Sequence, residues 1–354
     1  MAGSDAALLS RRMLGRDALA LAGAAFVTRA LPAAVAPPVD PLAFVDPELR
    51  PTARVILAMM NTPPRGATLL SVMRGLGGPP PAPLADVPWV EKRVPGLAGA
   101  PDVVVYLINA RDGATRPAIL HTHGGGFISG SAKAEIRAKQ ELARSLDCVV
   151  VTVEYRLAPE TRYTGSVADN YAALHWVHAN APALRVDRSR IAVMGESAGG
   201  GHAALLAQMA RDRGEIPLAL QVLIYPMLDD RTGIDRPVPP QIGRIGWDQR
   251  ANTLGWASFL GVPPGRHGVP PAGVPARTPR LAGLAPAFIG VGSVDLFVEE
   301  DIAYARRLTD QGVPTELVVA PGAFHGFDGA APETQIARRF TAAKIAALRR
   351  TFDR

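Results

Sequence analysis

IAVMGESAGG, residues 191–200, joins an apolar run to a helix-like run of small residues in this 354-residue chain. Ile191–Met194 has the composition of a short buried strand, and Gly200–Ala210 suits a helix. Between them, Ser197 has glycines two positions to either side, Gly195 and Gly199. A tight turn requires these glycines, because side chains there would collide with neighbouring backbone. The turn predicts a serine hydroxyl exposed at a sheet edge, beside a helix N-terminus that favours negative charge. A glycine-rich turn with a capping serine is the alternative.

The rest of the chain alternates between short apolar runs and longer helix-like stretches. Such alternation predicts an α/β fold in which a mostly parallel sheet is covered by helices on both faces. Residues that carry chemistry are then expected at the carboxyl ends of the strands. The apolar runs are Val103–Ile108, Ala118–Leu120, Val149–Val153, Ile191–Met194, Leu220–Ile224, Phe288–Val291 and Leu317–Val319, and the helix candidates are 132–146, 166–180, 198–213, 298–312 and 333–351.

Two parts of the chain depart from this alternation. Residues 37–88 contain helical stretches at Pro51–Met60 and Gly66–Leu76. Residues from about 229 to 280 are rich in proline and glycine around a helical piece, Asp248–Leu260. A long excursion inside a compact fold is usually functional, and often a lid.

A serine hydroxyl is a good nucleophile only with a general base beside it. In a strand–turn–helix arrangement of this kind the base follows the serine in the chain. Of the histidines that do so, His202 lies just over one turn along the helix and His267 lies in the excursion. His325 comes directly after the last apolar run, where a strand-end loop is expected. His325 is therefore the predicted base, with a surface loop histidine as the alternative.

The base needs a carboxylate that fixes its tautomer and stabilises its charged form. Asp295 ends the run Ala287–Val294, the position expected of a strand-end loop. Glu299, Glu300 and Asp301 are competitors, but they fall in the first turn of the next helix candidate. Acidic residues there commonly interact with the helix dipole. Asp295 is the predicted acid.

A glycine run follows the strand candidate Ala118–Leu120, in the segment His123-Gly124-Gly125-Gly126-Phe127. Consecutive glycines leave backbone N–H groups bare, so that they can closely approach an oxyanion. A phosphate-binding loop is the rival interpretation, but neither a Walker-type lysine pattern nor a G-x-G-x-x-G spacing is present.

Composition argues against several other kinds of site. The formal charge is +6, but the arginines are scattered and aromatic residues make up only 6%, so no nucleic-acid site is expected. The single cysteine, Cys148, excludes an intrachain disulfide. It lies in the apolar run Cys148–Val151, which lacks the polar setting of a catalytic thiol. Outside the N-terminal region no stretch of about 18 apolar residues occurs, and no membrane-spanning helix is expected.

The first 36 residues carry features of an export signal. Ser10-Arg11-Arg12-Met13-Leu14 resembles a twin-arginine signal, and Ala18–Val27 is apolar and alanine-rich. Ala34-Val35-Ala36 fits a small-residue cleavage site before Pro37. We expect residues 1–36 to direct export to the periplasm or the outside of the cell. An amphipathic N-terminal helix of a cytoplasmic protein is the alternative, because charged residues bracket a rather short apolar segment.

These pieces together closely resemble the bacterial hormone-sensitive-lipase-like (family IV) esterases of the α/β-hydrolase superfamily. They occur in the family's order between about residues 120 and 330, and their joint occurrence is highly specific. The matching elements are His123-Gly124-Gly125-Gly126, Tyr155-Arg156-Leu157-Ala158-Pro159-Glu160, Gly195-Glu196-Ser197-Ala198-Gly199-Gly200, Asp295 with Glu299-Glu300, and His325-Gly326-Phe327.

The resemblance implies an α/β-hydrolase fold with an eight-stranded, mostly parallel sheet and a helical cap. The cap would combine the helices of residues 37–88 with the insertion at about 229–280, on a catalytic domain of residues 89–354. The insertion contains the aromatic residues Trp247, Trp256 and Phe259. They would either line the acyl pocket or pack the cap helix against its neighbours.

The resemblance also implies roles for individual residues. The N–H groups of Gly125, Gly126 and Ala198 would donate to the oxyanion. Tyr155–Glu160 would be structural and brace the floor of the site. The remaining motif residues would support the site, and they are His123, Gly124, Gly195, Glu196 and Gly199.

Two departures from the family pattern stand out. Glu196 occupies a position where many relatives carry aspartate, a change that leaves the mechanism intact. Asp295 is followed by Leu296-Phe297 in place of the more usual Pro-Leu, which loosens the assignment of the acid.

The activity implied is hydrolysis of carboxylic esters with short to medium acyl chains, through an acyl-enzyme and without a metal or organic cofactor. Hydrolysis of a lactone, amide or carbamate by the same residues is the alternative. A non-catalytic ligand-binding relative is a remote alternative. Such a protein would be expected to have a broken triad, whereas Ser197, Asp295 and His325 are all present here. The expected partner is a small-molecule ester, with no nucleic acid and no stable membrane insertion. The oligomeric state is left open, a homodimer included.

Overall fold

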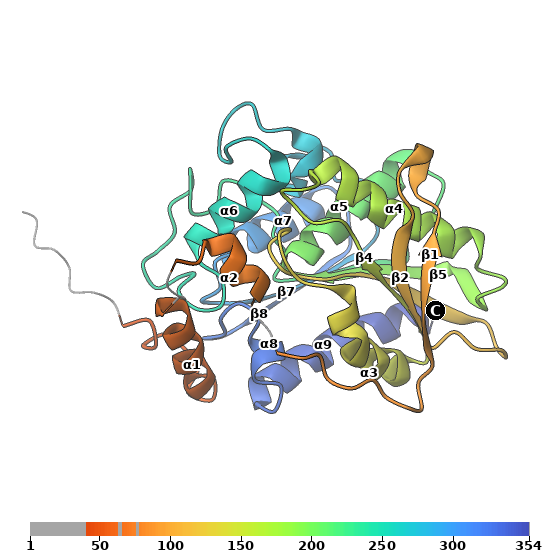
Figure 1. Ribbon diagram of the computed structural model, residues 1–354, viewed down its shortest axis with the longest axis horizontal. Coiled ribbons are helices and arrows are strands. Elements are labelled where there is room, and N and C mark those ends of the chain that lie inside the picture. The colour runs from red at the N-terminus through yellow and green to blue at the C-terminus, as the bar shows by residue number, and fades with distance from the viewer. Residues whose placement is uncertain (1–39, 63–65, 76–77, 354) are drawn as a thin grey trace, which may run out of the picture. The chain divides into compact units, whose positions relative to one another are not determined.

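The computed structural model describes residues 40–62, 66–75 and 78–353, so the predicted export signal lies outside the described residues. An eight-stranded sheet in the order β1-β2-β4-β3-β5-β6-β7-β8 forms its centre (Figure 1). Strands β3 to β8 run parallel to one another, whereas β2 is antiparallel to both β1 and β4. The mostly parallel α/β-hydrolase sheet predicted from the sequence is confirmed.

The bounds of the elements follow the predicted alternation closely from β2 onward. The strands are β1 Trp89–Val94, β2 Val103–Ile108, β3 Arg116–Thr122, β4 Val149–Glu154, β5 Val186–Glu196, β6 Leu220–Ile224, β7 Ala287–Gly292 and β8 Thr315–Ala320. The helices are α1 Arg50–Asn61, α2 Leu69–Gly75, α3 Ile136–Leu146, α4 Tyr163–Ala179, α5 Ala198–Arg213, α6 Gln249–Leu260, α7 Val298–Asp310, α8 Phe327–Ala330 and α9 Gln335–Phe352, with short 3₁₀ turns at Leu97–Gly99, Ala132–Glu135, Pro271–Gly273 and Pro275–Arg277.

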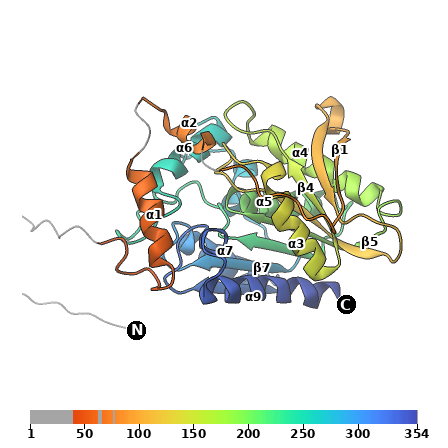
Figure 2. The same cartoon turned by 60° about the horizontal axis from the view of Figure 1, so that its bottom comes forward.

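Apolar side chains cover the sheet on both faces. On one face α4, α5 and α7 pack against the strands, and their buried residues share one core cluster with those of β2, β3, β4 and β5. On the other face α3 and α9 lie side by side and share a second cluster with β6 and β7 (Figure 2). Central strands such as β3, β6 and β7 are buried along their whole length. Burial on both faces explains why they read as continuous apolar runs in the sequence.

Two differences from the sequence prediction have clear physical reasons. Strand β1 was not among the predicted runs, because it pairs only with β2 at the sheet edge and five of its six residues are exposed. Helix α2 begins at Leu69 and not at Gly66. Gly66 has a positive φ of 75°, and the Thr68 hydroxyl then accepts a hydrogen bond from the Ser71 N–H at 3.1 Å, as an N-cap does.

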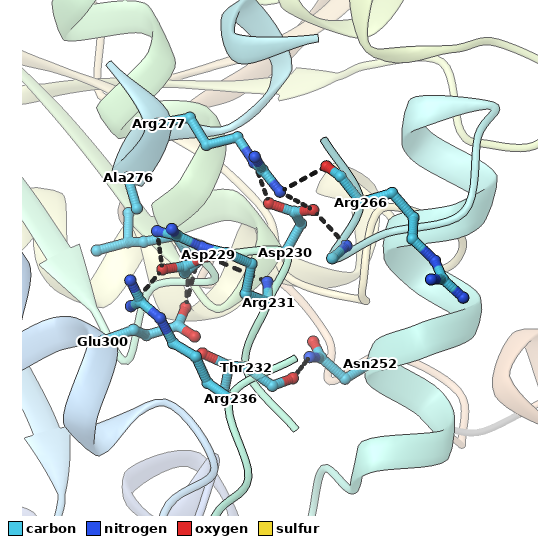
Figure 3. Close-up of polar contacts among 12 residues, drawn as sticks. Asp229, Asp230, Arg231, Thr232, Arg236, Asn252, Arg266, Ala276, Arg277 and Glu300 are labelled. Atoms are coloured by element: carbon cyan, nitrogen blue, oxygen red, sulfur yellow. Dashed lines mark hydrogen bonds and ion pairs between the residues drawn. The ribbon is translucent and has the colours of Figure 1, made fainter. Parts of the chain in front are cut away.

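The segment from Asp229 to Arg280 contains α6, two 3₁₀ turns and no strand. Its base is held by buried charges (Figure 3). Asp230 accepts from the Arg277 guanidinium at 2.6 and 2.9 Å and from the Gly265 N–H at 2.7 Å. Asp229 accepts from Arg231 at 2.7 and 2.8 Å, and from Arg236 at 2.7 Å. Both ends of the segment are thereby tied together.

The first turn of α7 also holds this base. Glu300 Oε1 accepts from the backbone N–H groups of Leu228 and Asp229 at 2.6 and 3.0 Å (Figure 3). Burial, with the nearby Asp229 carboxylate, raises the pKa of Glu300 well above its ordinary value. The first residues of the segment are therefore fixed to the helix that begins just after Asp295.

Cys148 begins the buried run that enters β4 and is fully buried. Burial raises the pKa of its thiol to about 12. Among the described helices, none is long and apolar enough to cross a membrane.

Candidate active site

Ser197 occupies the turn between the end of β5 and the start of α5. Its φ of 58° and ψ of −121° are strained for a residue with a side chain. The glycines at either side permit the close approach that the turn needs. A Cβ atom on Gly195 would lie 2.2 Å from the Gly199 carbonyl oxygen, and one on Gly199 would lie 2.0 Å from the Thr122 carbonyl oxygen.

The structure brings Ser197, His325 and Asp295 into one chain of hydrogen bonds. His325 Nε2 lies 2.9 Å from Ser197 Oγ, and His325 Nδ1 lies 2.8 Å from Asp295 Oδ2. This arrangement fits the tautomer with Nδ1 protonated, which donates to the carboxylate and leaves Nε2 free to accept the serine proton. Asp295 Oδ1 accepts from the Phe297 N–H at 3.0 Å. Asp295 is fully buried, and Ser197 is 6% exposed.

The competing carboxylates do not contact His325. Glu300 accepts from the backbone at the base of the insertion, and Glu299 is exposed. Asp301 is fully buried, and its carboxylate oxygens have no hydrogen-bond partner among the described residues. Burial, together with the Glu300 and Asp295 carboxylates, raises the pKa of Asp301 well above its ordinary value. Of these carboxylates, Asp295 alone is placed to orient the histidine.

Three aromatic rings surround the imidazole of His325. The ring centroids of Tyr225, Phe297 and Trp247 lie 4.8, 5.2 and 6.3 Å from its own. The Tyr225 hydroxyl donates to Asp328 Oδ1 at 2.8 Å, on the helix that follows His325. Neither Tyr225 nor Phe297 was predicted from the sequence to belong to the site. Tyr225 directly follows β6, and Phe297 lies two residues after Asp295. These positions in the chain were the signals that could have assigned them to the site.

The glycine run lies beside the serine in a conformation that only glycine adopts easily. Gly125 and Gly126 have φ values of 120° and 61°. Within the part of the chain that the structure describes, the N–H groups of Gly125, Gly126 and Ala198 donate to no protein acceptor. A Cβ on Gly124 would lie 3.5 Å from Ser197 Cβ, so the loop passes directly over the serine. The predicted oxyanion donors are thereby brought to the nucleophile and left free.

Side chains behind the glycine run hold it in place. The Tyr155 hydroxyl donates to the His123 carbonyl oxygen at 2.8 Å, and the two rings stack at 4.2 Å. His123 Nδ1 lies 2.8 Å from the Gly124 carbonyl oxygen. On the far side of the loop, the Ser129 hydroxyl donates to the Gly125 carbonyl oxygen at 2.9 Å. Tyr155, in the segment that was expected to brace the floor of the site, thus contacts the start of the glycine run.

Helix α2 reaches the same loop through one arginine. Arg74 pairs with both carboxylate oxygens of Glu160 at 2.8 and 2.7 Å. It also donates to the carbonyl oxygens of Ile128 and Ala158 at 2.9 and 3.0 Å. The hydrogen bond from Arg74 lowers the pKa of Glu160 to about 2. An N-terminal helix is therefore attached to the loop that follows the glycine run.

A buried charge network lies behind the nucleophile turn. Glu196 accepts from His121 Nε2 at 2.7 Å and from Lys139 Nζ at 2.8 Å, while His121 Nδ1 lies 2.8 Å from the Thr152 hydroxyl. Burial alone would raise the pKa of Glu196, but Lys139 and His121 hold it well below its ordinary value. Burial lowers the pKa of His121, so its imidazole is neutral and donates to Glu196 through Nε2. Neither His121 nor Lys139 was predicted from the sequence to contact Glu196, because these contacts exist only in the folded chain.

A further histidine is buried against the loop. His202 on α5 packs on Tyr155, Phe127 and Phe259, with centroid distances of 4.5, 5.2 and 5.3 Å. Its ring nitrogens have no hydrogen-bond partner among the described residues. Burial lowers the pKa of His202 to about 3 and that of His123 to about 4. Both imidazoles are therefore neutral near pH 7 and serve as packing surfaces.

Comparisons with known proteins place this chain among the α/β hydrolases. Residues 119–329 match the family described as the alpha/beta hydrolase fold. The chain is 33% identical to carboxylesterase NlhH of Mycobacterium tuberculosis over 321 residues, which cover 88% of this chain and 92% of that protein. It is 34% identical to the ethyl acetate hydrolase of Pseudomonas putida over 66% of this chain and 78% of that protein.

The chain belongs to the hormone-sensitive-lipase-like esterases of the α/β-hydrolase superfamily. Among solved structures, a bacterial heroin esterase superposes on it with a TM-score of 0.75 and 35% identity, over 88% of this chain and 99% of that one. This family member is a serine carboxylic-ester hydrolase, as the sequence resemblance implied.

Proposed function

We propose that this esterase hydrolyses esters of short to medium-length carboxylic acids with Ser197 as nucleophile, His325 as general base and acid, and Asp295 as the orienting carboxylate. The observation that carries the proposal is the continuous chain of hydrogen bonds through the three side chains, at 2.9 and 2.8 Å. A bound esterase substrate would place its carbonyl carbon against Ser197 Oγ and its carbonyl oxygen at the glycine run.

In the acylation step His325 Nε2 takes the proton of Ser197 as Oγ bonds to the ester carbonyl carbon. The carbonyl oxygen gains the negative charge and accepts from the N–H groups of Gly125, Gly126 and Ala198. Protonated His325 then donates its proton to the leaving ester oxygen. The carbonyl double bond re-forms as the bond between that oxygen and the acyl carbon breaks. The alcohol leaves and the acyl group stays on Ser197.

In the deacylation step a water molecule takes the place of the alcohol. His325 accepts a proton from this water as its oxygen bonds to the acyl carbon, and the second tetrahedral intermediate uses the same N–H donors. Collapse of the intermediate returns the proton to Ser197 Oγ and releases the carboxylic acid. Buried Asp295 stabilises the imidazolium in both steps.

The substrate class rests on the relatives. One relative is an ethyl acetate hydrolase and another a carboxylesterase. We therefore place simple esters ahead of lactones, amides or carbamates, on which the same residues could act.

Replacing the nucleophile tests the assignment. Ser197→Ala should lower kcat for ethyl butyrate by at least about 10⁴-fold, since the attacking atom is lost. The matched control is Ser189→Ala, an exposed serine away from the turn, which should keep the activity of the unmodified enzyme. Circular dichroism and thermal unfolding would verify that both variants fold. Turnover by folded Ser197→Ala at the unmodified rate would contradict the proposal, and a parallel panel of lactones and amides would rank the substrate classes.

We further propose that α1, α2 and the segment 229–280 form a cap over this site, and that residues 1–36 are removed on export. The twin-arginine pattern and the small residues before Pro37 support export. N-terminal sequencing of the mature protein would decide the matter. A chain that begins at Pro37 supports processing, and one that begins at residue 1 or 2 contradicts it.

A further inference from the structure

The side chain of Trp247 forms a wall of the active site. It lies in the insertion just before α6 and is 3% exposed. A Cβ on Gly126 would lie 2.1 Å from its Cη2 atom and 2.7 Å from its Cζ2 atom. The six-membered ring of the indole therefore rests directly on the backbone of a proposed oxyanion donor.

The same ring borders the catalytic histidine. Its centroid lies 6.3 Å from that of His325, at an interplanar angle of 41°. The residue before it, Gly246, has a positive φ of 82°, and a Cβ there would lie 2.3 Å from the His325 carbonyl oxygen. The indole thus borders both the place where the oxyanion forms and the base that protonates the leaving oxygen.

Several contacts fix the indole in this position. Its Nε1–H donates to the Asn252 side-chain oxygen at 3.3 Å. The Asn252 amide in turn donates to the Thr232 carbonyl oxygen at 2.9 Å, at the charged base of the insertion (Figure 3). Earlier in the same segment, the Gly243 N–H donates to the Val294 carbonyl oxygen at 3.1 Å, next to the catalytic Asp295. Trp247 is thereby attached to the base of the insertion and to the loop that carries Asp295.

The other aromatic residues of the insertion lie elsewhere. Trp256 and Phe259 contact the ring of Phe127 at 5.1 and 3.9 Å, and both are almost fully buried. They belong to the packed core between α6 and the loop. Of the three aromatic residues that were candidates for an acyl pocket, only Trp247 lies on the glycine run.

We propose that Trp247 is a specificity-determining residue that limits the size of the leaving alcohol, and that the enzyme acts on esters of small alcohols. This inference rests on the proposed function. In the tetrahedral intermediate the leaving oxygen must lie within hydrogen-bond reach of His325 Nε2, while the oxyanion lies at the glycine run. The Trp247 ring borders both His325 and the glycine run, so it lies on the side of the tetrahedral carbon where the alcohol part of the ester extends. The acyl chain extends from the carbon in the remaining direction, away from this ring.

Two ester series would separate the alcohol side from the acyl side. One keeps the acid constant, from ethyl to octyl butyrate, and the other keeps the alcohol constant, from ethyl butyrate to ethyl octanoate. In Trp247→Ala, kcat/KM for octyl butyrate relative to ethyl butyrate should rise on the order of tenfold, the discrimination that small steric differences produce in apolar pockets. The ratio for ethyl octanoate over ethyl butyrate should change by less than about threefold.

Controls keep the outcome decisive. Trp256→Phe changes a neighbouring tryptophan that does not border the glycine run, and it should leave both ratios as in the unmodified enzyme. If Trp247→Ala does not fold, Trp247→Phe and Trp247→Leu provide smaller changes with the same expected direction. Unchanged ratios in folded variants, or a rise in the acyl ratio in place of the alcohol ratio, would overturn the assignment. Failure of the proposed function would appear separately, as turnover of ethyl butyrate that survives Ser197→Ala.

Discussion

The residue before the nucleophile couples the catalytic turn to the interior. The Glu196 side chain is 19% exposed, and its charge is matched by Lys139, which comes from α3 and is 5% exposed. Neutral His121 donates to the other carboxylate oxygen. A buried ion pair of this kind adds little if both partners are exchanged for apolar groups, but loss of one partner leaves an uncompensated charge.

Removal of the lysine should therefore destabilise the fold more than its size suggests. Lys139→Met is expected to lower the free energy of unfolding by about 3–5 kcal/mol at pH 7. Chemical denaturation followed by fluorescence would measure it. The matched control is Lys133→Met, an exposed lysine at the turn before α3, which should change stability by no more than about 0.5 kcal/mol.

The pH dependence of that loss has a definite sign. The folded pKa of Glu196 is lowered from 4.5, so its contribution exists above about pH 4.5 and is lost as pH falls through the folded value. The pKa of Lys139 is raised from 10.5, because Glu196 and Glu135 outweigh the effect of burial. The stability that Lys139 contributes is present below pH 10.5 and is lost as pH rises through the pKa of Lys139 in the folded protein. The difference between Lys139→Met and the unmodified enzyme should be largest between these limits. A difference that grew in acid would contradict this account.

Residues of the proposed triad could be predicted from the sequence because each lies in the turn or loop that follows a recognisable strand. Ser197, Asp295 and His325 follow β5, β7 and β8, and parallel strands present their carboxyl ends at one edge. Lys139 and Trp247 could not be predicted in this way. Lys139 lies mid-helix, and Trp247 lies in an insertion whose course depends on packing and not on a regular period.

At the scale of elements, α6 determines the position of the glycine run. A Cβ on Gly255 would lie 2.6 Å from the Gly126 carbonyl oxygen, so the helix and the loop are in direct backbone contact. The Asp248 carboxylate caps the start of α6 by accepting from the Ala251 N–H at 2.8 Å. Leu70 and Met73 of α2 pack against the buried cluster that contains Trp256 and Phe259 of α6. Helix α2 lies beside α6 in both views (Figures 1 and 2).

A single methyl group between these elements should impair catalysis. Gly255→Ala is expected to displace α6 or the Gly126 peptide, because the added carbon has no room. The variant should lose about 1–3 kcal/mol of stability and show a lower kcat with ethyl butyrate, since an oxyanion donor is misplaced. Gly268→Ala is the control, because a Cβ there has open space within the same insertion. Equal kcat values for the two variants would argue against backbone control of the loop by α6.

The elements that the sequence predicted well are those buried on both faces. Strands β6 and β7 match their apolar runs to within a residue at each end, and α5 matches its predicted bounds. Strand β1 was not predicted, because apolar and polar residues alternate only weakly in its sequence, WVEKRV. Backbone pairing with β2 stabilises this strand, and its mostly exposed side chains contribute little. The insertion could be located but its path could not, since buried carboxylates and glycines fix it through contacts distant in the chain.

At the scale of the whole molecule, buried neutral histidines make stability depend on pH. Burial lowers the pKa of His202 to about 3 and that of His123 to about 4, from 6.5. Below pH 6.5 the unfolded chain binds protons that the folded chain does not. Stability contributed by these residues is therefore complete above pH 6.5 and is lost as pH falls toward the folded pKa values.

The expected loss between pH 7 and pH 5 is on the order of 1–2 kcal/mol for each of these histidines. Urea denaturation of the unmodified enzyme and of His202→Leu at both pH values would measure it. The variant should lose less stability on acidification than the unmodified enzyme, whatever its stability at pH 7. His267→Gln, a change to an exposed histidine of the insertion, should retain the full dependence. An identical dependence in His202→Leu would exclude a contribution from that residue.

The buried position of Cys148 makes it possible to label the enzyme at one chosen site and to detect movement of the insertion during turnover. It is the single cysteine of the chain, and its thiol is enclosed and carries a pKa of about 12. Maleimide reagents attack thiolates, so they should leave the native enzyme unlabelled. A cysteine introduced at the exposed Thr253 of α6 would then take a fluorophore or spin label alone. Such a probe would report whether the insertion moves during turnover, without prior removal of a native thiol.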